Sequence, residues 1–85
     1  MATLPPSEHS RARLEAQYTN YLEVGHNAFE FLLDFGRSSP EGEEATFHTR
    51  IITSPSCAKA LFELLRDSIE QYEKTFGPIL TEQSM

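Results

Sequence analysis

The sequence predicts an α+β fold: a three-stranded antiparallel β-meander followed by one long C-terminal α-helix packed on one sheet face, in the order β-β-β-α. Three observations predict it. Apolar and polar residues largely alternate over residues 18–35, the period of strands with one buried face. A second alternating segment covers residues 46–53. Beyond it, apolar residues recur at steps of three and four as far as Gly77, the spacing of an amphipathic helix.

The first two strands are expected at residues 18–25 and 28–35, joined by a two-residue turn at 26–27. This register places Leu22 opposite Phe31, so that apolar side chains of both strands share a face. A slip of one residue would mix the two faces, which is costly once one of them is buried. The third strand is expected to lead directly into the helix.

The pairing sorts the strand residues into two faces. An apolar face is expected to hold Leu22, Val24, Phe29, Phe31, Leu33, Phe35, Phe47 and Ile51. A polar face is expected to hold Tyr21, Glu23, Glu30, Leu32, Asp34, His48, Arg50 and Ile52. Glu23 would lie across from Glu30, an unfavourable pair unless Arg50 or His48 on the neighbouring strand compensates for it. The phenylalanines are interpreted as core, because a base-stacking platform requires basic flanks and theirs are acidic.

The helix has clear ends. Ser54 suits the N-cap, Pro55 the first helical position, and Gly77-Pro78 marks the end. One apolar stripe is expected from Ala58, Leu61, Phe62, Leu65, Ile69, Tyr72 and Phe76, widened by Cys57, Leu64 and Ser68. The opposite side is spaced for the i,i+4 pairs Lys59–Glu63, Arg66–Glu70 and Glu70–Lys74. Such a helix spans about 33 Å, whereas seven-residue strands reach about 23 Å, so its far end must overhang or rest on a second subunit.

Length and composition favour one small, self-associating domain. The chain has 85 residues, interpreted as a disordered N-terminal arm (1–16), a single α+β domain (17–79) and a disordered tail (80–85). A domain of this size is marginal alone, so we expect a homodimer or higher oligomer. We also expect a cytoplasmic protein, because no apolar segment approaches the ~20 residues of a membrane helix and no signal peptide is evident.

Charge and cysteine content exclude several function classes. The net charge is −6, and an acidic chain lacks the lysines and arginines that neutralise phosphates, so direct nucleic-acid binding is not expected. Cys57 is the single cysteine, which excludes an internal disulfide and a cysteine-rich zinc site. It is interpreted as a small packing residue, since no histidine is positioned to activate it.

A candidate interaction surface combines the polar sheet face with the hairpin tip. Its polar members are His26, Glu30, His48 and Arg50. Arg50 would anchor a carboxylate, either of a partner or of Glu30, because a guanidinium binds carboxylates through two parallel hydrogen bonds. Carboxylates with one histidine suit many divalent metals, and no ligand spacing selects one. No catalytic residue, cofactor or metal site is therefore assigned.

Two longer motifs point to a family. Residues 23–36 (EVGHNAFEFLLDFG) and 48–55 (HTRIITSP), followed by Ala58-Lys59, Leu64-Leu65, Tyr72-Glu73 and the 76–79 run FGPI, resemble a family of short bacterial proteins known only as a domain of unknown function. The resemblance covers residues 18 to 79. It implies strands followed by a helix and carries no catalytic assignment.

Two classes of function follow. The first is a small, acidic, non-enzymatic protein-interaction module that associates with itself and with other proteins. The second is a transcription-related or nucleic-acid-associated regulator that acts through the arm, where Arg11 and Arg13 lie, or through a partner. An enzyme is not expected.

Overall fold

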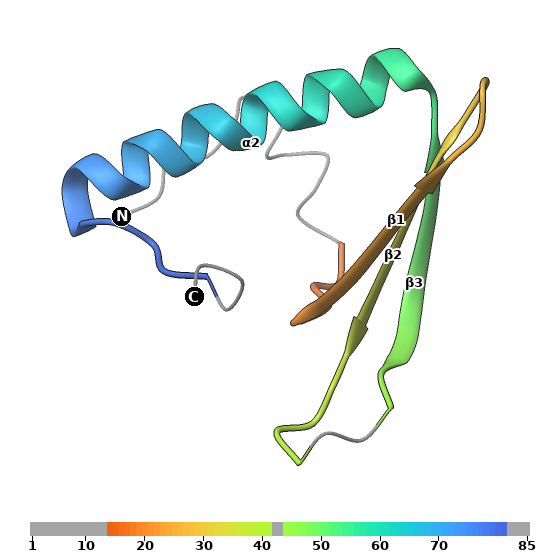
Figure 1. Ribbon diagram of the computed structural model, residues 1–85, viewed down its shortest axis with the longest axis horizontal. Helices are drawn as coiled ribbons and strands as arrows, with labels where there is room; N and C mark the ends of the chain where they lie inside the picture. Colours follow the sequence, from red (N-terminus) through yellow and green to blue (C-terminus); the bar gives the residue numbers. More distant parts are fainter. Residues whose placement is uncertain (1–13, 42–43, 82–85) are drawn as a thin grey trace.

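The protein was analysed as a computed structural model that describes residues 14–41 and 44–81. Its elements are β1 (Tyr21–His26), β2 (Phe31–Arg37), β3 (Thr46–Thr53) and α2 (Pro55–Phe76). The strands form one antiparallel sheet in the order β1-β2-β3, and the helix follows β3 (Figure 1). The predicted α+β class and β-β-β-α order are confirmed. The predicted arm and tail fall mainly on residues outside the described ranges.

The register of the first hairpin differs from the prediction. Leu22 pairs with Phe35 rather than with Phe31, a displacement of four residues. Because the displacement is even, the apolar residues of both strands still share one face. The connection is a four-residue turn over 27–30, so β2 begins at Phe31 instead of residue 28. Phe29 lies in that turn with 80% of its surface exposed, and its assignment to the core is wrong.

A β-bulge between Phe35 and Gly36 changes the end of the sheet. Gly36 pairs with Phe47, whereas Phe35 pairs with Thr49, so β3 has one additional residue and its alternation reverses. Phe47 therefore lies on the polar face, with its ring centroid 5.6 Å from that of Tyr21. The prediction that placed Phe47 on the apolar face is wrong for this reason.

The start of β1 is held to the end of β2 by side chains. The Thr19 hydroxyl accepts a hydrogen bond from the Gly36 amide (3.1 Å) and lies 2.7 Å from the Gly36 carbonyl oxygen. The Asn20 side chain accepts from the Ser38 amide (2.9 Å) and donates to the Ser38 carbonyl (3.2 Å). Regular backbone pairing thus begins at Tyr21, later than the predicted residue 18, because hydrogen bonds from the Thr19 and Asn20 side chains hold the chain before it.

Both ends of α2 are where the sequence predicts them. The Ser54 hydroxyl accepts from the Cys57 amide (3.1 Å), which satisfies one of the free N–H groups of the first turn. Gly77 adopts φ +99° and donates its amide to the Glu73 carbonyl (3.0 Å). The Glu73 carboxylate also accepts from the Ile79 amide (2.8 Å), so residues beyond the helix turn back under it.

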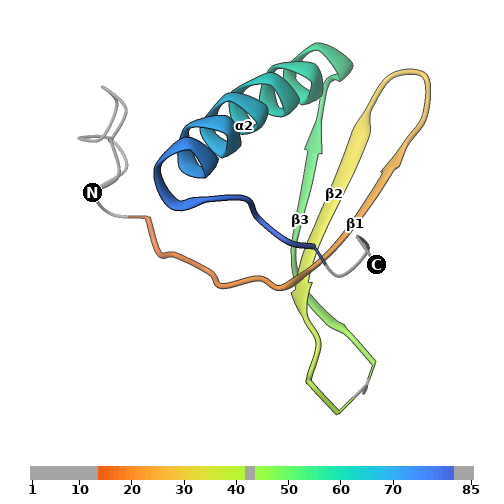
Figure 2. The same cartoon turned by 60° about the vertical axis from the view of Figure 1, so that its left-hand side comes forward.

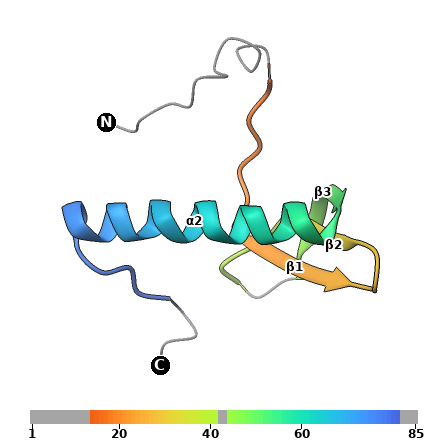
Figure 3. The same ribbon diagram turned by 90° about the horizontal axis from the view of Figure 1, so that it is seen from above.

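The helix and the sheet diverge from their junction at Ser54. Figures 1 and 2 show the two elements separating, and Figure 3 shows the C-terminal part of α2 extending past the sheet. Within the described ranges no hydrophobic side chain is buried. Phe31 is half-buried, whereas Leu65 remains 54% exposed. The overhang predicted from the helix length is therefore present, and the expected packing of the helix stripe on the sheet is absent from the single chain.

Candidate interaction surface

The four predicted surface residues lie in two separate places. His26 ends β1 and Glu30 ends the hairpin turn, whereas Arg50 and His48 lie on β3. Arg50 pairs with Asp34, which in turn pairs with Glu23, three residues along β1 from His26. Three residues of strand cover about 10 Å. The sheet therefore does not bring these side chains together into one site.

The hairpin tip is rigidly built around one side chain. Asn27 Oδ1 accepts from the amides of Phe29 (2.8 Å) and Glu30 (2.9 Å), while the Asn27 amide donates to the Glu30 carbonyl (3.0 Å). Asparagine favours such turns because its side chain mimics a backbone acceptor. A shallow hollow beside the turn is lined by Gly25, His26, Asn27, Glu30 and Leu32. The backbone of Phe29 and Glu30 is thus hydrogen-bonded to Asn27, while the Phe29 side chain is exposed.

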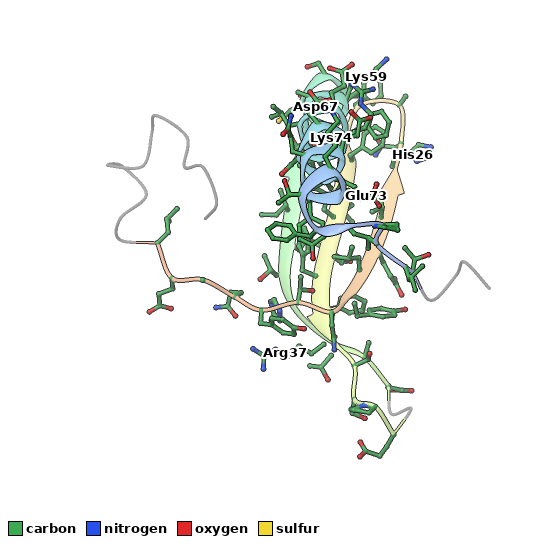
Figure 4. All side chains as sticks on the ribbon, turned by 90° about the vertical axis from the view of Figure 1, so that its left-hand side faces the viewer. His26, Arg37, Lys59, Asp67, Glu73 and Lys74 are labelled. Atoms are coloured by element: carbon green, nitrogen blue, oxygen red, sulfur yellow. The ribbon has the colours of Figure 1, made fainter. Side chains whose placement is uncertain are left out.

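His26 belongs to the apolar sheet face. It pairs with Phe31, and the two rings stack with centroids 5.3 Å apart and planes 26° from parallel. Figure 4 shows His26 beside the hairpin tip. Its stacking partner makes the ring part of the hydrophobic surface of the hairpin, which leaves its edge nitrogens as the polar groups available to a ligand.

Arg50 is occupied by a carboxylate of its own sheet. Its Nε and one terminal nitrogen donate to the two oxygens of Asp34 at 2.8 and 2.9 Å. This bidentate bond holds the pKa of Asp34 below its ordinary value of 3.8. Glu30 lies in the turn, so the prediction that it could be the in-chain partner of Arg50 is wrong, as is the predicted Glu23–Glu30 pairing. Glu23 instead accepts a hydrogen bond from the Tyr21 hydroxyl (2.8 Å), which raises the pKa of Tyr21.

His48 helps to hold the segment before β1. Its Nε2 lies 3.0 Å from the Tyr18 carbonyl oxygen and its Nδ1 lies 2.7 Å from the Thr49 hydroxyl. Arg37 donates to the same carbonyl (3.3 Å) and its guanidinium lies 5.7 Å from the centre of the Tyr18 ring. These contacts give His48 a structural role at the bulged end of the sheet.

An uncovered apolar surface runs along α2. The exposed side chains of its stripe and flank are Leu61, Phe62, Leu64, Leu65, Ile69, Tyr72 and Phe76. In the middle of the helix a groove is lined by Phe62, Leu65, Arg66, Ile69 and Glu70. The sequence indicated this surface through the helix length and Leu64, but the stripe was interpreted as core. Cys57, expected to pack, is also exposed.

Two further findings concern the described residues. None of their His, Cys, Asp and Glu side chains form a group of three or more that could hold a metal ion. None of their helices is long and apolar enough to cross a membrane. Arg11 and Arg13, on which the regulator alternative depends, lie outside the described ranges.

Comparison with known proteins identifies a family for this chain. The model of a family described as "Protein of unknown function (DUF3467)" matches residues 4–81. No curated protein and no solved structure matches the chain.

Proposed function

Since the chain belongs to the DUF3467 family, whose description names no activity, we propose a function from its surface: a homodimeric, non-enzymatic protein-interaction module. One observation carries the proposal. In the described part of the chain the hydrophobic side chains are all at least partly exposed, although both the sheet and the helix are strongly amphipathic. Large exposed apolar surfaces mark sites where a protein, a membrane or a ligand binds, and a protein is the occupant proposed here.

The exposed area is large enough for a stable interface. Phe62, Leu64 and Phe76 expose 59%, 70% and 68% of their surfaces. At about 150–250 Å² per aromatic side chain and similar values for leucine, the apolar side chains of α2 expose on the order of 800 Å². One partner of a standard protein interface contributes about 800 Å². The helix alone therefore offers a complete half-interface.

Magnitudes favour association over a folded monomer. Burial of about 800 Å² on each helix contributes on the order of 20 kcal/mol per chain before entropic costs, at about 25 cal/mol per Å². The net stability of an ordinary domain is only about 5–15 kcal/mol. A single chain lacks this contribution, so we infer that folding and self-association are coupled.

A second copy is the partner that the proposal requires first. It is always present at the same concentration, and C2 homodimers are the commonest soluble oligomers. Other proteins would then bind the surfaces that the dimer leaves free. One of these is the hairpin tip, where Phe29 is the most exposed aromatic side chain. The acidic surface makes a basic or neutral protein a better partner for the dimer than a nucleic acid.

Sedimentation velocity from low to high micromolar concentration tests the proposal. The natural chain should sediment as a dimer, whereas Leu65→Glu, which places a charge in the stripe, should lose the dimer. The matched control Asp67→Glu lies on the opposite side of α2 and should leave the dimer unchanged. A natural chain that is folded and monomeric at high micromolar concentration would overturn the proposal.

A further inference from the structure

We propose that α2 packs against α2 of a second copy in antiparallel orientation, with the two helices crossing near Leu65. This inference rests on the self-association proposed above and specifies its interface. It is carried by the position of the groove, by the charges that flank the stripe, and by the overhang of the helix beyond the sheet.

The groove lies near the midpoint of α2. Its apolar lining consists of Phe62, Leu65 and Ile69, which extend about one turn to either side of the helix midpoint. A two-fold axis perpendicular to the helix must pass through a surface that matches itself on rotation. A central groove with apolar residues on both sides of Leu65 meets that condition, because Leu61 and Ile69 exchange places across the axis.

The two flanks of the stripe differ in character. At 100° per residue, Lys59, Arg66 and Glu70 follow one flank, whereas Leu64 and Cys57 follow the other. Figure 4, which looks along the helix, shows the charged residues Lys59, Asp67, Glu73 and Lys74 around it, and by the same spacing Asp67 and Lys74 lie on the side opposite the stripe rather than on the flank of Leu64. The helix thus has a charged flank and an apolar flank beside the same stripe.

Antiparallel packing matches these flanks and parallel packing does not. Rotation about an axis perpendicular to the helices brings each flank against its own copy. Lys59 of one copy then lies close to Glu70 of the second copy, because the two residues lie six positions before and five positions after Leu65. A parallel pair would set the charged flank of one helix against Leu64 of the other. The charged side chains would then lose water without gaining partners of opposite charge.

The charges concerned are available for such pairs. The i,i+4 pairs expected within the helix are absent from the ion pairs of the described ranges, which are Arg50–Asp34 and Arg66–Asp67. Arg66 reaches Asp67 only at 3.3 Å, with both side chains more than half exposed. Lys59, Glu63 and Glu70 therefore make no ion pair within residues 14–41 and 44–81.

The overhang supports the same orientation. The C-terminal part of α2 extends past its own sheet (Figure 3). In an antiparallel pair, the N-terminus of the second helix, and therefore the second sheet, lies at that overhanging end. The exposed apolar residues of each sheet, such as Leu22, Val24 and Ile51, then contribute to one shared core with both helices.

Cysteine cross-linking tests the geometry. Residues near a two-fold axis meet their own copies, so Leu65→Cys in a Cys57→Ser background should form an intermolecular disulfide rapidly under mild oxidation. Asp67→Cys in the same background is the matched control at the same height on the opposite side, and should cross-link many-fold more slowly. If sedimentation shows a dimer and the two variants cross-link at equal rates, the helix pairing is wrong while self-association stands. A monomer would overturn both.

Charge exchange tests the orientation without touching the stripe. Lys59→Glu and Glu70→Lys should each weaken homodimerisation several-fold, because each creates two repulsive contacts. An equimolar mixture of the two variants restores both contacts, so native mass spectrometry should find heterodimers well above their statistical share. The control mixture of Lys74→Glu with natural chain should stay at the statistical share. Statistical mixing of the two variants would overturn the antiparallel register.

Discussion

Strand β2 and helix α2 are both amphipathic, yet their surroundings differ sharply. β2 lies between two strands, and its residues from Phe31 to Phe35 are all half-buried. In α2 only Ala58 and Glu73 are half-buried, and every other residue is exposed. The central strand is thus partly covered by its two neighbours, whereas almost all of the helix is uncovered in the single chain. One prediction below tests the helix, and three test the sheet.

The largest effect is expected at the helix stripe. Leu65→Ala should lower the free energy of unfolding by about 2–5 kcal/mol, the range for leucines in a packed interior, because the second copy covers this side chain in the proposed dimer. Leu80→Ala is the control, since Leu80 is 87% exposed and lies outside the helix. Urea unfolding at one fixed protein concentration gives both values. Equal, small losses at the two positions would place Leu65 in solvent.

The next effect concerns the bulge. A Cβ at Gly36 would clash with the Thr46 carbonyl oxygen and approach Phe47 Cα to 2.9 Å, both of them backbone atoms. Gly36→Ala should therefore destabilise the protein by about 1–3 kcal/mol through overpacking. Gly25→Ala is the control within the same sheet, because no atom lies within 4 Å of its added methyl group. Thermal unfolding measures both variants. Equal midpoint temperatures for Gly36→Ala and Gly25→Ala would contradict the bulge geometry.

A smaller effect is expected at the hairpin tip. Asn27→Ala removes the acceptor for two backbone amides and should lower the free energy of unfolding by about 1 kcal/mol. Asn27→Asp keeps an oxygen in that position and should retain most of the stability. Chemical denaturation separates the variants. A tip that tolerates alanine as well as aspartate would mean that the turn is held by its backbone alone.

The smallest effect is expected from the exposed ion pair of Arg50 and Asp34. Bonding to Arg50 lowers the pKa of Asp34 in the folded state, so the pair stabilises the protein above the ordinary pKa of 3.8, and this contribution is lost as the pH falls through the lower folded value. Arg50→Ala should reduce stability modestly at neutral pH and have less effect well below pH 3.8. Urea titrations at the two pH values measure the difference. A difference that does not depend on pH would exclude this linkage.

The elements with local signals could be predicted from the sequence. The limits of β3 and α2 agree with the prediction, because Ser54-Pro55 and Gly77 fix the helix ends through contacts within a few residues. The hairpin register could not be predicted in the same way. A turn centred on residues 26–27 and one centred on residues 28–29 both keep the faces aligned, and the structure has the second, in which the Asn27 side chain accepts from the Phe29 and Glu30 amides.

The interaction surface was predictable only in part. The displaced register separated Arg50 from Glu30 and brought it to Asp34. The bulge at Gly36 moved Phe47 to the polar face. The helix stripe itself was evident from its spacing, but an apolar stripe indicates only that the helix packs against another surface. Whether the same chain or a second one supplies that cover depends on how α2 leaves the sheet at Ser54.

The proposal that the hydrophobic core forms between two copies is tested by the concentration dependence of unfolding. Urea unfolding is followed by circular dichroism at low and at high micromolar protein. If folding requires a second copy, the midpoint rises with concentration, because dilution favours dissociated, unfolded chains. A midpoint that is the same at both concentrations, for a protein that sediments as a monomer, would contradict the claim.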